Sequence, residues 1–196
     1  MRRRLIDAAR AEFSDKGIEA GTTRGIAERA GCNEVTLFRH FSSKLKLLEA
    51  VVSDTSDDFA ELCACGGGFS GDLTADLMKF AVVYNASLER CEGMARVMIG
   101  EGRRQPTLCK ELIGDVLQPF HRAVASCLEQ AKQSGKVRDG VDVMAFAEIF
   151  TSALMGGVLR RSSALTKLDR DAWLHQTVSL LQTGISFAPT STTIKP

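Results

Sequence analysis

The sequence predicts an all-α protein: an N-terminal three-helix domain with a helix-turn-helix, joined by a long helix to a larger helical domain. Two observations lead to this fold class. Apolar residues recur three or four positions apart along almost every segment, and no segment alternates apolar and polar residues as a half-buried strand does. The 196 residues are also enough to bury a substantial core.

The first predicted helix has an apolar face made of Leu5, Ile6, Ala9 and Phe13. We expect it to end near Lys16-Gly17, because glycine readily takes the left-handed backbone conformation that closes many helices.

Residues 22–41, TTRGIAERAGCNEVTLFRHF, predict two short helices joined by a tight turn. Ala27 is small where two helices must cross closely, Gly31 can end the first helix, and Asn33 offers an oxygen to cap the second. This is the pattern of a helix-turn-helix, whose second helix can enter the major groove of DNA. The apolar positions, expected to form a small core with Phe13, are Ile26, Ala27, Ala30, Leu37 and Phe41.

A longer helix should follow, capped by Ser42 or Ser43, and the glycines of residues 65–71 should end it. Its apolar residues are Leu45, Leu48, Val51, Val52, Phe59 and Leu62. Further helices are expected over 72–90, 94–99, 106–134 (kinked or divided by Pro119), 142–159 and 169–187. We therefore divide the chain into a helix-turn-helix domain (1–47), a larger domain (48–188) and a disordered tail (189–196).

The segment 142–159 is apolar around most of its circumference, so we expect it to be buried on more than one side. Gly156-Gly157 would let another helix come close. If one face of the last two helices packs on its own domain, the remaining apolar surface needs a partner, and an antiparallel four-helix contact in a two-fold dimer fits. The alternative is an internal core without a dimer. The residues expected at the dimer interface are Phe150, Leu154, Val158, Trp173, Val178, Leu181 and Ile185.

Composition and motifs argue against several classes of protein. The net charge is only +1, but residues 1–50 hold 10 Lys/Arg against 7 Asp/Glu, a modest basic excess beside the predicted helix-turn-helix. No uninterrupted apolar run is long enough for a membrane span, and the charged N-terminus does not fit a secretory signal, so we expect a cytoplasmic protein. The three histidines lack metal-ligand spacing and no HExxH, GxSxG or GxGxxG motif occurs, so no enzyme activity, cofactor or metal is expected.

The cysteines at positions 32, 63, 65, 91, 109 and 127 form no CxxC pair. Buried free thiols are the expected interpretation, and a redox role for Cys63 and Cys65 is the alternative.

The N-terminal pattern resembles the TetR family of bacterial transcriptional regulators over residues 5–48. The agreement rests on Leu5 with Ala8-Ala9, Phe13, Lys16-Gly17, Thr23, Ile26-Ala27, Ala30-Gly31, Thr36-Leu37, Phe41 and Lys44. Beyond residue 48 only the helical layout matches, with a weaker likeness at EGRRQPTLCKELIGDVLQP. The resemblance implies a homodimeric repressor that binds a palindromic, double-stranded DNA operator and is released by a small-molecule effector bound in the 48–188 domain, which also dimerises.

The resemblance also implies a set of DNA-contacting residues. Thr23 begins the positioning helix, where its hydroxyl faces phosphate, and Arg24 assists. In the recognition helix Asn suits adenine, Glu accepts from cytosine, and the Val and Thr methyl groups suit thymine. The alternatives are that Asn33 only caps, that Thr36 bonds within its helix, and that His40 is a neutral surface residue. The full set is Thr23, Arg24, Asn33, Glu34, Val35, Thr36, Phe38, Arg39, His40 and Lys44.

Two residues depart from the family pattern. Phe38 replaces the usual Tyr and loses a hydroxyl contact to phosphate, and Glu34 replaces Lys or another polar residue and adds repulsion unless it meets a cytosine. These departures keep other functions open: an activator, a repressor without an effector, or a protein-interaction adaptor that has lost DNA binding.

The effector site is expected between helices of the larger domain, lined by apolar residues. Plain core packing is the alternative for each candidate. Glu101, Arg103 and Arg104 are further candidates to orient a polar ligand group, with surface charge as their alternative. The candidates for the lining are Phe80, Tyr84, Met94, Met98, Phe120, His121, Met144, Phe146 and Met155.

Overall fold

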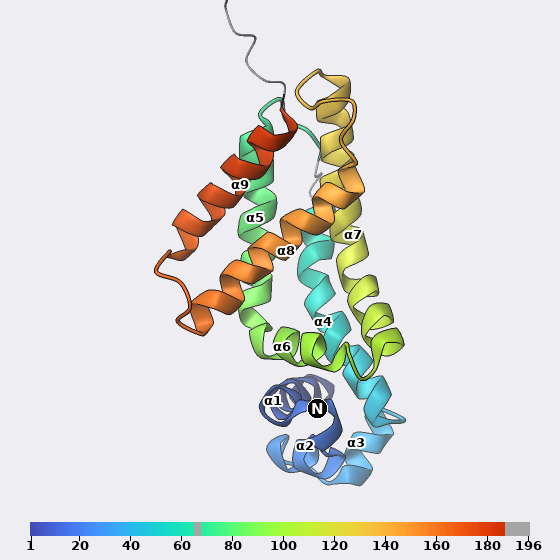
Figure 1. Ribbon diagram of the computed structural model, residues 1–196. Coiled ribbons are helices and arrows are strands. Elements are labelled where there is room, and N and C mark those ends of the chain that lie inside the picture. The colour runs from blue at the N-terminus through green and yellow to red at the C-terminus, as the bar shows by residue number, and fades with distance from the viewer. Residues whose placement is uncertain (65–67, 187–196) are drawn as a thin grey trace, which may run out of the picture. The chain divides into compact units, whose positions relative to one another are not determined.

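The computed structural model describes the backbone of residues 1–64 and 68–186, without the side chains of residues 55–64 and 115. Every regular element in this part is a helix, which confirms the predicted fold class (Figure 1). The helices are α1 (Arg2–Ala20), α2 (Thr23–Arg29), α3 (Glu34–His40), α4 (Lys44–Ala64), α5 (Leu73–Arg90), α6 (Glu92–Glu101), α7 (Pro106–Gln133), α8 (Val143–Ser162) and α9 (Arg170–Ile185). The predicted tail at 189–196 and the side chains of Phe59 and Leu62 lie outside the described residues.

The chain packs as two compact units. The first comprises residues 1–65 and 83–120, and the second comprises residues 66–82 and 121–196. Helices α5 and α7 each contribute to both units. In α7 the division follows Pro119, where the sequence predicts a kink or a break, although the helix itself continues through this proline.

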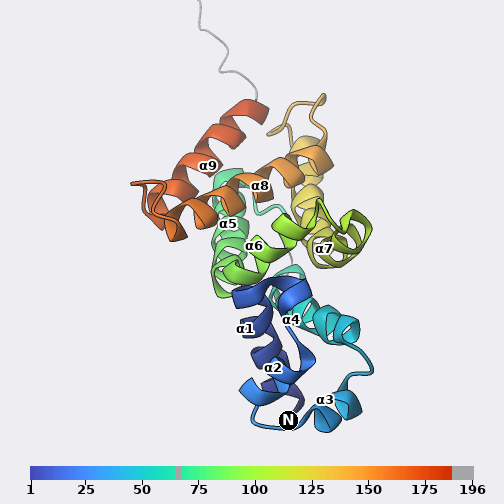
Figure 2. The same ribbon diagram turned by 60° about the horizontal axis from the view of Figure 1, so that its bottom comes forward.

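The core of the first unit forms where the sequence places it. Phe13, Ile26 and Leu37 are fully buried and Phe41 is nearly so. In α1 the expected end at Gly17 is a kink instead: Gly17 has φ +83°, and one further helical turn continues to Ala20. Helix α1 packs against α2, α4 and α6, and Figures 1 and 2 show it beside α2.

Hydrogen bonds decide the predicted cap of α4 and show a further cap on α5. Ser43, rather than Ser42, caps α4, since its Oγ accepts from the backbone N–H of Lys46 at 3.1 Å. Asp72 caps α5 by accepting from the N–H of Ala75 at 3.0 Å, and the non-helical stretch before it includes Gly71 with φ +101°. These polar contacts satisfy backbone groups that a helix start leaves without partners.

In the second unit, α8 and α9 pack side by side (Figure 1). Trp173 of α9 lies directly over Gly157 of α8, where a Cβ atom would come within 2.7 Å of the indole Cε2, and its Nε1 donates to the carbonyl of Ala153 at 3.0 Å. The expected close approach at the glycine pair is therefore confirmed at Gly157. Within the described residues α8 is long and apolar enough for a membrane span, with a mean hydropathy of 1.4, but core helices share these properties and α8 buries Phe146, Phe150 and Leu154 inside the chain.

Candidate nucleic-acid interface

The turn between α2 and α3 has the geometry that its residues predict. Thr22 caps α2 through a hydrogen bond from the N–H of Gly25 at 3.0 Å. Gly31 takes the left-handed conformation with φ +65°, and the N–H of Cys32 then bonds back to the carbonyl of Ala27 at 2.9 Å. Asn33 begins the next helix. The turn is thus built by local contacts that each depend on one residue type.

Helix α3 presents an exposed edge on the side away from Leu37, which is completely buried. Val35 is 61% exposed and Phe38 is 48% exposed, although both are large apolar side chains. Arg39 and His40 are exposed on the same short helix. Apolar groups left in water beside the Arg39 cation suit contacts to thymine methyl groups and to phosphates.

Asn33 and Thr36 bond to each other within the protein. The Asn33 Oδ1 accepts from the Thr36 N–H and from the Thr36 hydroxyl, each at 2.8 Å. Asn33 therefore caps α3 and Thr36 bonds at the start of its own helix, the two contacts that the alternative interpretation names. Contacts of these residues with DNA stay a prediction. The cap employs the oxygen of the Asn33 carboxamide, which leaves its NH₂ group as the group suited to a base edge.

The start of α2 is joined to the start of α3. The Thr23 hydroxyl donates to the Glu34 Oε1 at 2.7 Å, although the sequence assigns this hydroxyl to phosphate. The neighbouring Arg24 is exposed and donates to Glu28 at 2.9 Å, a hydrogen bond that raises the pKa of the guanidinium. Arg24 thus keeps its positive charge on the surface of α2.

Lys44 contacts the end of α1. Its Nζ donates to the carbonyl of Glu19 at 3.0 Å and lies 5.9 Å from the centre of the Phe13 ring. A cation at the C-terminal end of a helix interacts favourably with its unpaired carbonyls. In this structure Lys44 therefore closes α1, while the sequence assigns it to the DNA backbone.

Glu12 joins α1 to α2 beneath the helix-turn-helix, a role that was not predicted from the sequence. Its carboxylate is buried between α1 and α2, where it pairs with Lys16 at 2.7 Å and with Arg29 at 2.8 Å. The hydrogen bond from Lys16 is the main cause that lowers the pKa of Glu12, and Arg29 adds to it. Gly25 makes room for this group, because a Cβ atom there would lie 2.5 Å from the Glu12 Oε1. The available signal was an acid next to the core residue Phe13.

Comparison with known proteins agrees with this geometry. The family model described as bacterial regulatory proteins of the tetR family matches residues 5–51, and the model of the tetracyclin repressor-like C-terminal domain matches residues 70–181, more than half of the chain. The chain belongs to the TetR family. It is therefore a DNA-binding transcriptional regulator, and the predicted resemblance is confirmed.

Relatives of this TetR-family regulator match it along most of its length. The HTH-type transcriptional regulator YvkB of Bacillus subtilis is 26% identical, with 94% of this chain and 96% of the relative covered. The repressor KstR of Rhodococcus jostii is 29% identical over 92% of this chain and 82% of the relative. Among solved structures, FadR of Bacillus subtilis in complex with stearoyl-CoA has a TM-score of 0.80 at 20% identity, covering 94% and 100% of the two chains. At this identity the structure shows a shared fold.

The predicted ligand-binding residues of the TetR-family chain fall in both compact units. In the first unit, Tyr84 and Phe120 pack together with ring centres 5.3 Å apart, and burial raises the pKa of the Tyr84 hydroxyl. The buried residues of this group in the first unit are Tyr84, Met94, Met98 and Phe120, and in the second unit they are Phe80, His121 and Phe146, with Met144 and Met155 half-buried. The buried members of this set therefore pack inside their own unit, and their role in binding an effector stays a prediction.

His121 is the polar member of that group. Its Nε2 lies 2.9 Å from the Thr151 Oγ1, and the Thr151 hydroxyl lies within hydrogen-bond distance of the Ala147 carbonyl at 3.1 Å. With the hydroxyl donating to this carbonyl, His121 carries its proton on Nε2. Burial lowers the pKa of His121 against an opposing effect of Glu148, so the neutral imidazole is favoured. Glu101 is buried and pairs with exposed Arg104 at 3.7 Å, and Arg103 is exposed.

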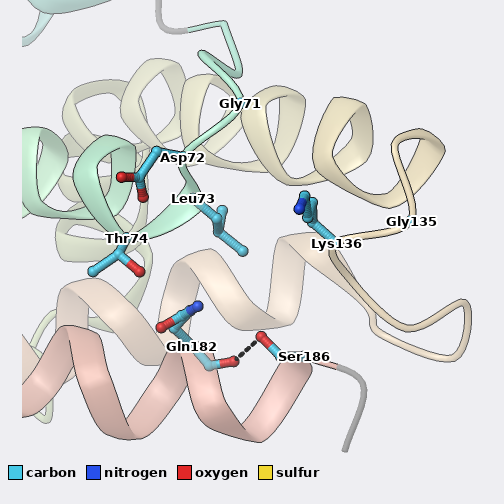
Figure 3. A pocket seen from close by; sticks show the side chains of 8 residues that line it. All are labelled: Gly71, Asp72, Leu73, Thr74, Gly135, Lys136, Gln182 and Ser186. Atoms are coloured by element: carbon cyan, nitrogen blue, oxygen red, sulfur yellow. Dashed lines mark hydrogen bonds between the residues drawn. The ribbon is translucent and has the colours of Figure 1, made fainter. Parts of the chain in front are cut away.

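A hollow of about 470 Å³ lies on the second unit, and Figure 3 shows it from close by. It is open, polar and apolar surface line it about equally, and it shares no residue with the predicted ligand-binding set. The Ser186 hydroxyl on its rim donates to the carbonyl of Gln182 at 2.9 Å. The lining residues are Gly71, Asp72, Leu73, Thr74, Gly135, Lys136, Gln182 and Ser186.

Most residues assigned to the dimer interface are buried within the TetR-family chain itself. Phe150, Leu154, Val158, Val178 and Ile185 are at most 7% exposed, and Trp173 and Leu181 are half-buried. These side chains therefore leave little surface for a partner. On the same two helices, Ile149 is 57% exposed and Leu180 is 70% exposed. The internal-core alternative describes the buried residues better, and the dimer stays a prediction.

The cysteines agree with the expectation of free thiols where they are described. Cys109 and Cys127 are buried, Cys32 and Cys91 are half-buried, and none of these four forms a disulfide. Burial raises the pKa of Cys127 to about 11, which keeps it protonated and unreactive. Cys63 and Cys65, the redox alternative, lie outside the described side chains.

Proposed function

We propose that this chain is a homodimeric repressor that binds a palindromic operator with α3 in the major groove and leaves it when a small molecule binds. The observation that carries the proposal is the exposed edge of α3. Val35 and Phe38 expose apolar surface beside Arg39, on a helix fixed by the capped turn. The proposed contact residues are the members of the predicted set at the edge of α3 and its cap, Asn33, Val35, Thr36, Phe38, Arg39 and His40, with Arg24 on α2.

A second copy of the chain would cover the apolar surface of α8 and α9. Ile149 and Leu180 are among the most exposed large apolar side chains of the chain, and they lie on helices that pack together. Two-fold pairing of such helices would place two recognition helices about 34 Å apart, one turn of DNA. Gly156, whose added Cβ would meet no atom within 4 Å, leaves room for close approach.

Effector release would act through α1, because α1 packs on both α4 and α6. Asp54 of α4 accepts hydrogen bonds from Arg3, at 2.6 Å, and from Arg10. On α6, a Cβ atom at Gly93 would lie 2.8 Å from the Ser14 Cβ, so these two helices touch backbone to side chain. A shift of α4 or α6 would therefore be transmitted to α1, the helix that supports α2 and α3. We call these two helices, with the turn between them, the reading head.

The effector test begins with the ligand named for a structural relative. FadR of Bacillus subtilis was solved with stearoyl-CoA, so long-chain acyl-CoA is the first candidate for this chain. An effector must bind the DNA-free form more tightly, and couplings of about 1–3 kcal/mol, roughly 5- to 150-fold in affinity, are typical.

DNA binding is titrated first on the region upstream of the gene and then against candidate effectors. We expect a complex that weakens with rising salt, as counterion release requires, and that dissociates with one effector. A complex that ignores every ligand the protein binds would contradict effector release. An absence of salt-dependent binding would favour the adaptor alternative. We further propose that the protein works in the cytoplasm and catalyses no reaction.

A further inference from the structure

The contact between Thr23 and Glu34 joins the two helices of the reading head at their first residues. The Thr23 Oγ1 lies 2.7 Å from the Glu34 Oε1, a short hydrogen bond to a charged acceptor. Both side chains are half-buried, so the bond is partly shielded from water. Among the described residues, no other side-chain hydrogen bond joins α2 to α3.

This bond decides what each partner can offer to DNA. A threonine hydroxyl carries a single hydrogen, and here it points to Glu34, so it cannot be donated to a phosphate at the same time. On the other side, the same bond holds the Glu34 carboxylate against the start of α2, while its second oxygen, Oε2, takes no part in this bond. The hydroxyl that the sequence assigns to phosphate and the carboxylate that it assigns to cytosine are therefore engaged with each other.

The charge of Glu34 is balanced where it lies. It occupies the first turn of α3, where the free backbone N–H groups favour a negative charge. The guanidinium of Arg24 adds a favourable electrostatic interaction. A carboxylate in this position therefore costs less DNA affinity than its charge alone suggests.

We propose that Glu34 is a positioning residue: it holds the start of α2 in register with α3 and selects no base. This inference rests on the proposed DNA contact face. Glu34 acts on DNA through Thr23, because the bond fixes the distance between the phosphate-facing end of α2 and the base-reading end of α3.

The test compares four variants on a duplex that the wild-type protein selects from a randomised pool. We expect Thr23→Val and Glu34→Ala each to weaken binding about fivefold, the usual value of one hydrogen bond. The double variant should be no weaker than either single variant, because both remove the same bond. Glu34→Gln retains an accepting oxygen and should stay within about twofold of wild type. Repeating the selection with each variant should return the same bases.

Glu28→Gln is the matched control, since it removes one exposed carboxylate of α2 that does not contact Thr23. Thermal unfolding of each variant checks the fold, and Thr23→Val and Glu34→Gln decide the test if Glu34→Ala unfolds.

Three results would overturn the inference. A changed base at one position with Glu34→Gln, but not with Thr23→Val, would show that Glu34 reads DNA. Tighter binding by Glu34→Ala, equal to that of Glu28→Gln, would reduce Glu34 to a repulsive charge. Additive losses in the double variant would show that the two residues act separately. A wild-type protein that selects no duplex would instead contradict the proposed function, which is a distinct outcome.

Discussion

Helices α3 and α8 use their apolar residues in opposite ways. The seven-residue α3 buries only Leu37 and leaves Val35 and Phe38 in water, whereas the twenty-residue α8 buries Phe146, Phe150 and Leu154 among others. A large apolar side chain that its own chain leaves exposed is available to an external partner. The solvent exposure of a helix's apolar side chains, rather than their number, therefore distinguishes an interaction surface from a core.

The largest expected effect tests Ile149 of α8 and Leu180 of α9, the large apolar side chains that these two helices leave exposed. Combining Ile149→Glu with Leu180→Glu should separate the dimer and lower affinity for a palindromic duplex at least about 100-fold, because each reading head then binds alone. Analytical ultracentrifugation and a binding titration measure the two effects. Replacing the polar neighbours, Ser152→Glu with Gln176→Glu, is the matched control for added charge. A double variant that stays dimeric would place the interface elsewhere.

The next effect tests the buried side of α8. Gly157→Val should destabilise the chain by about 2–3 kcal/mol, because the new side chain overlaps the Trp173 indole and breaks its bond to Ala153. Gly156→Ala, at a position with open space, should be neutral or slightly stabilising. Chemical denaturation measures both variants. Equal stability of the two would mean that Trp173 does not lie on Gly157.

The buried contact between α1 and α2 can be tested through Glu12. Glu12→Gln should cost roughly 1–2 kcal/mol at neutral pH, a discounted value because Lys16 and Arg29 are 49% and 40% exposed. The folded state lowers the pKa of Glu12 below its ordinary 4.5, so its contribution is present above that pH and is lost as the pH falls through the folded value. Unfolding free energies measured from pH 7 down to pH 3 should therefore converge for wild type and variant.

Asp7→Asn serves as the control on the same helix, since Asp7 is half exposed and pairs only with arginines near the surface. We expect it to change stability by less than about 0.5 kcal/mol. A difference in unfolding free energy between wild type and Glu12→Gln that persists at acid pH would show that the effect of Glu12 comes from packing rather than charge.

The smallest effects separate two roles on α3. Arg39→Ala should weaken binding to all duplexes by roughly 1 kcal/mol, as loss of a phosphate contact does. It should also reduce the slope of log affinity against log salt concentration by about one. Val35→Ala should leave the slope unchanged and alter the preferred base at one position. Binding titrations across salt and a repeated selection distinguish the two. If neither substitution changes affinity or preference, α3 does not dock as proposed.

The comparison also shows which features follow from sequence. The turn at Gly31 and the caps at Thr22, Asn33, Ser43 and Asp72 depend on single residues and their neighbours, so they can be predicted locally. The family pattern identifies the reading head for the same reason. Packing between distant segments depends on which helix faces meet, and local sequence does not specify this. For this reason most residues predicted at the dimer interface are buried within the chain, and the pairing of Glu12 with Lys16 and Arg29 was not predicted.

The polar contacts around the helix-turn-helix are less predictable than its backbone. The family resemblance assigns Lys44 and Thr23 to DNA, yet their groups contact Glu19 and Glu34 in the structure. A polar side chain on a surface has several partners within reach, and sequence spacing does not rank them. The effector site is harder still to predict, because most of its candidates are buried and are divided between the two units, so spacing alone does not separate lining from core.

Footprinting and stoichiometry on a duplex selected by the wild-type protein provide the most direct test that paired α3 edges read DNA. We expect two protected half-sites about 34 Å apart, two chains bound per duplex, and affinity that falls steeply with salt. One chain on a single site, or binding that is indifferent to both sequence and salt, would contradict this expectation.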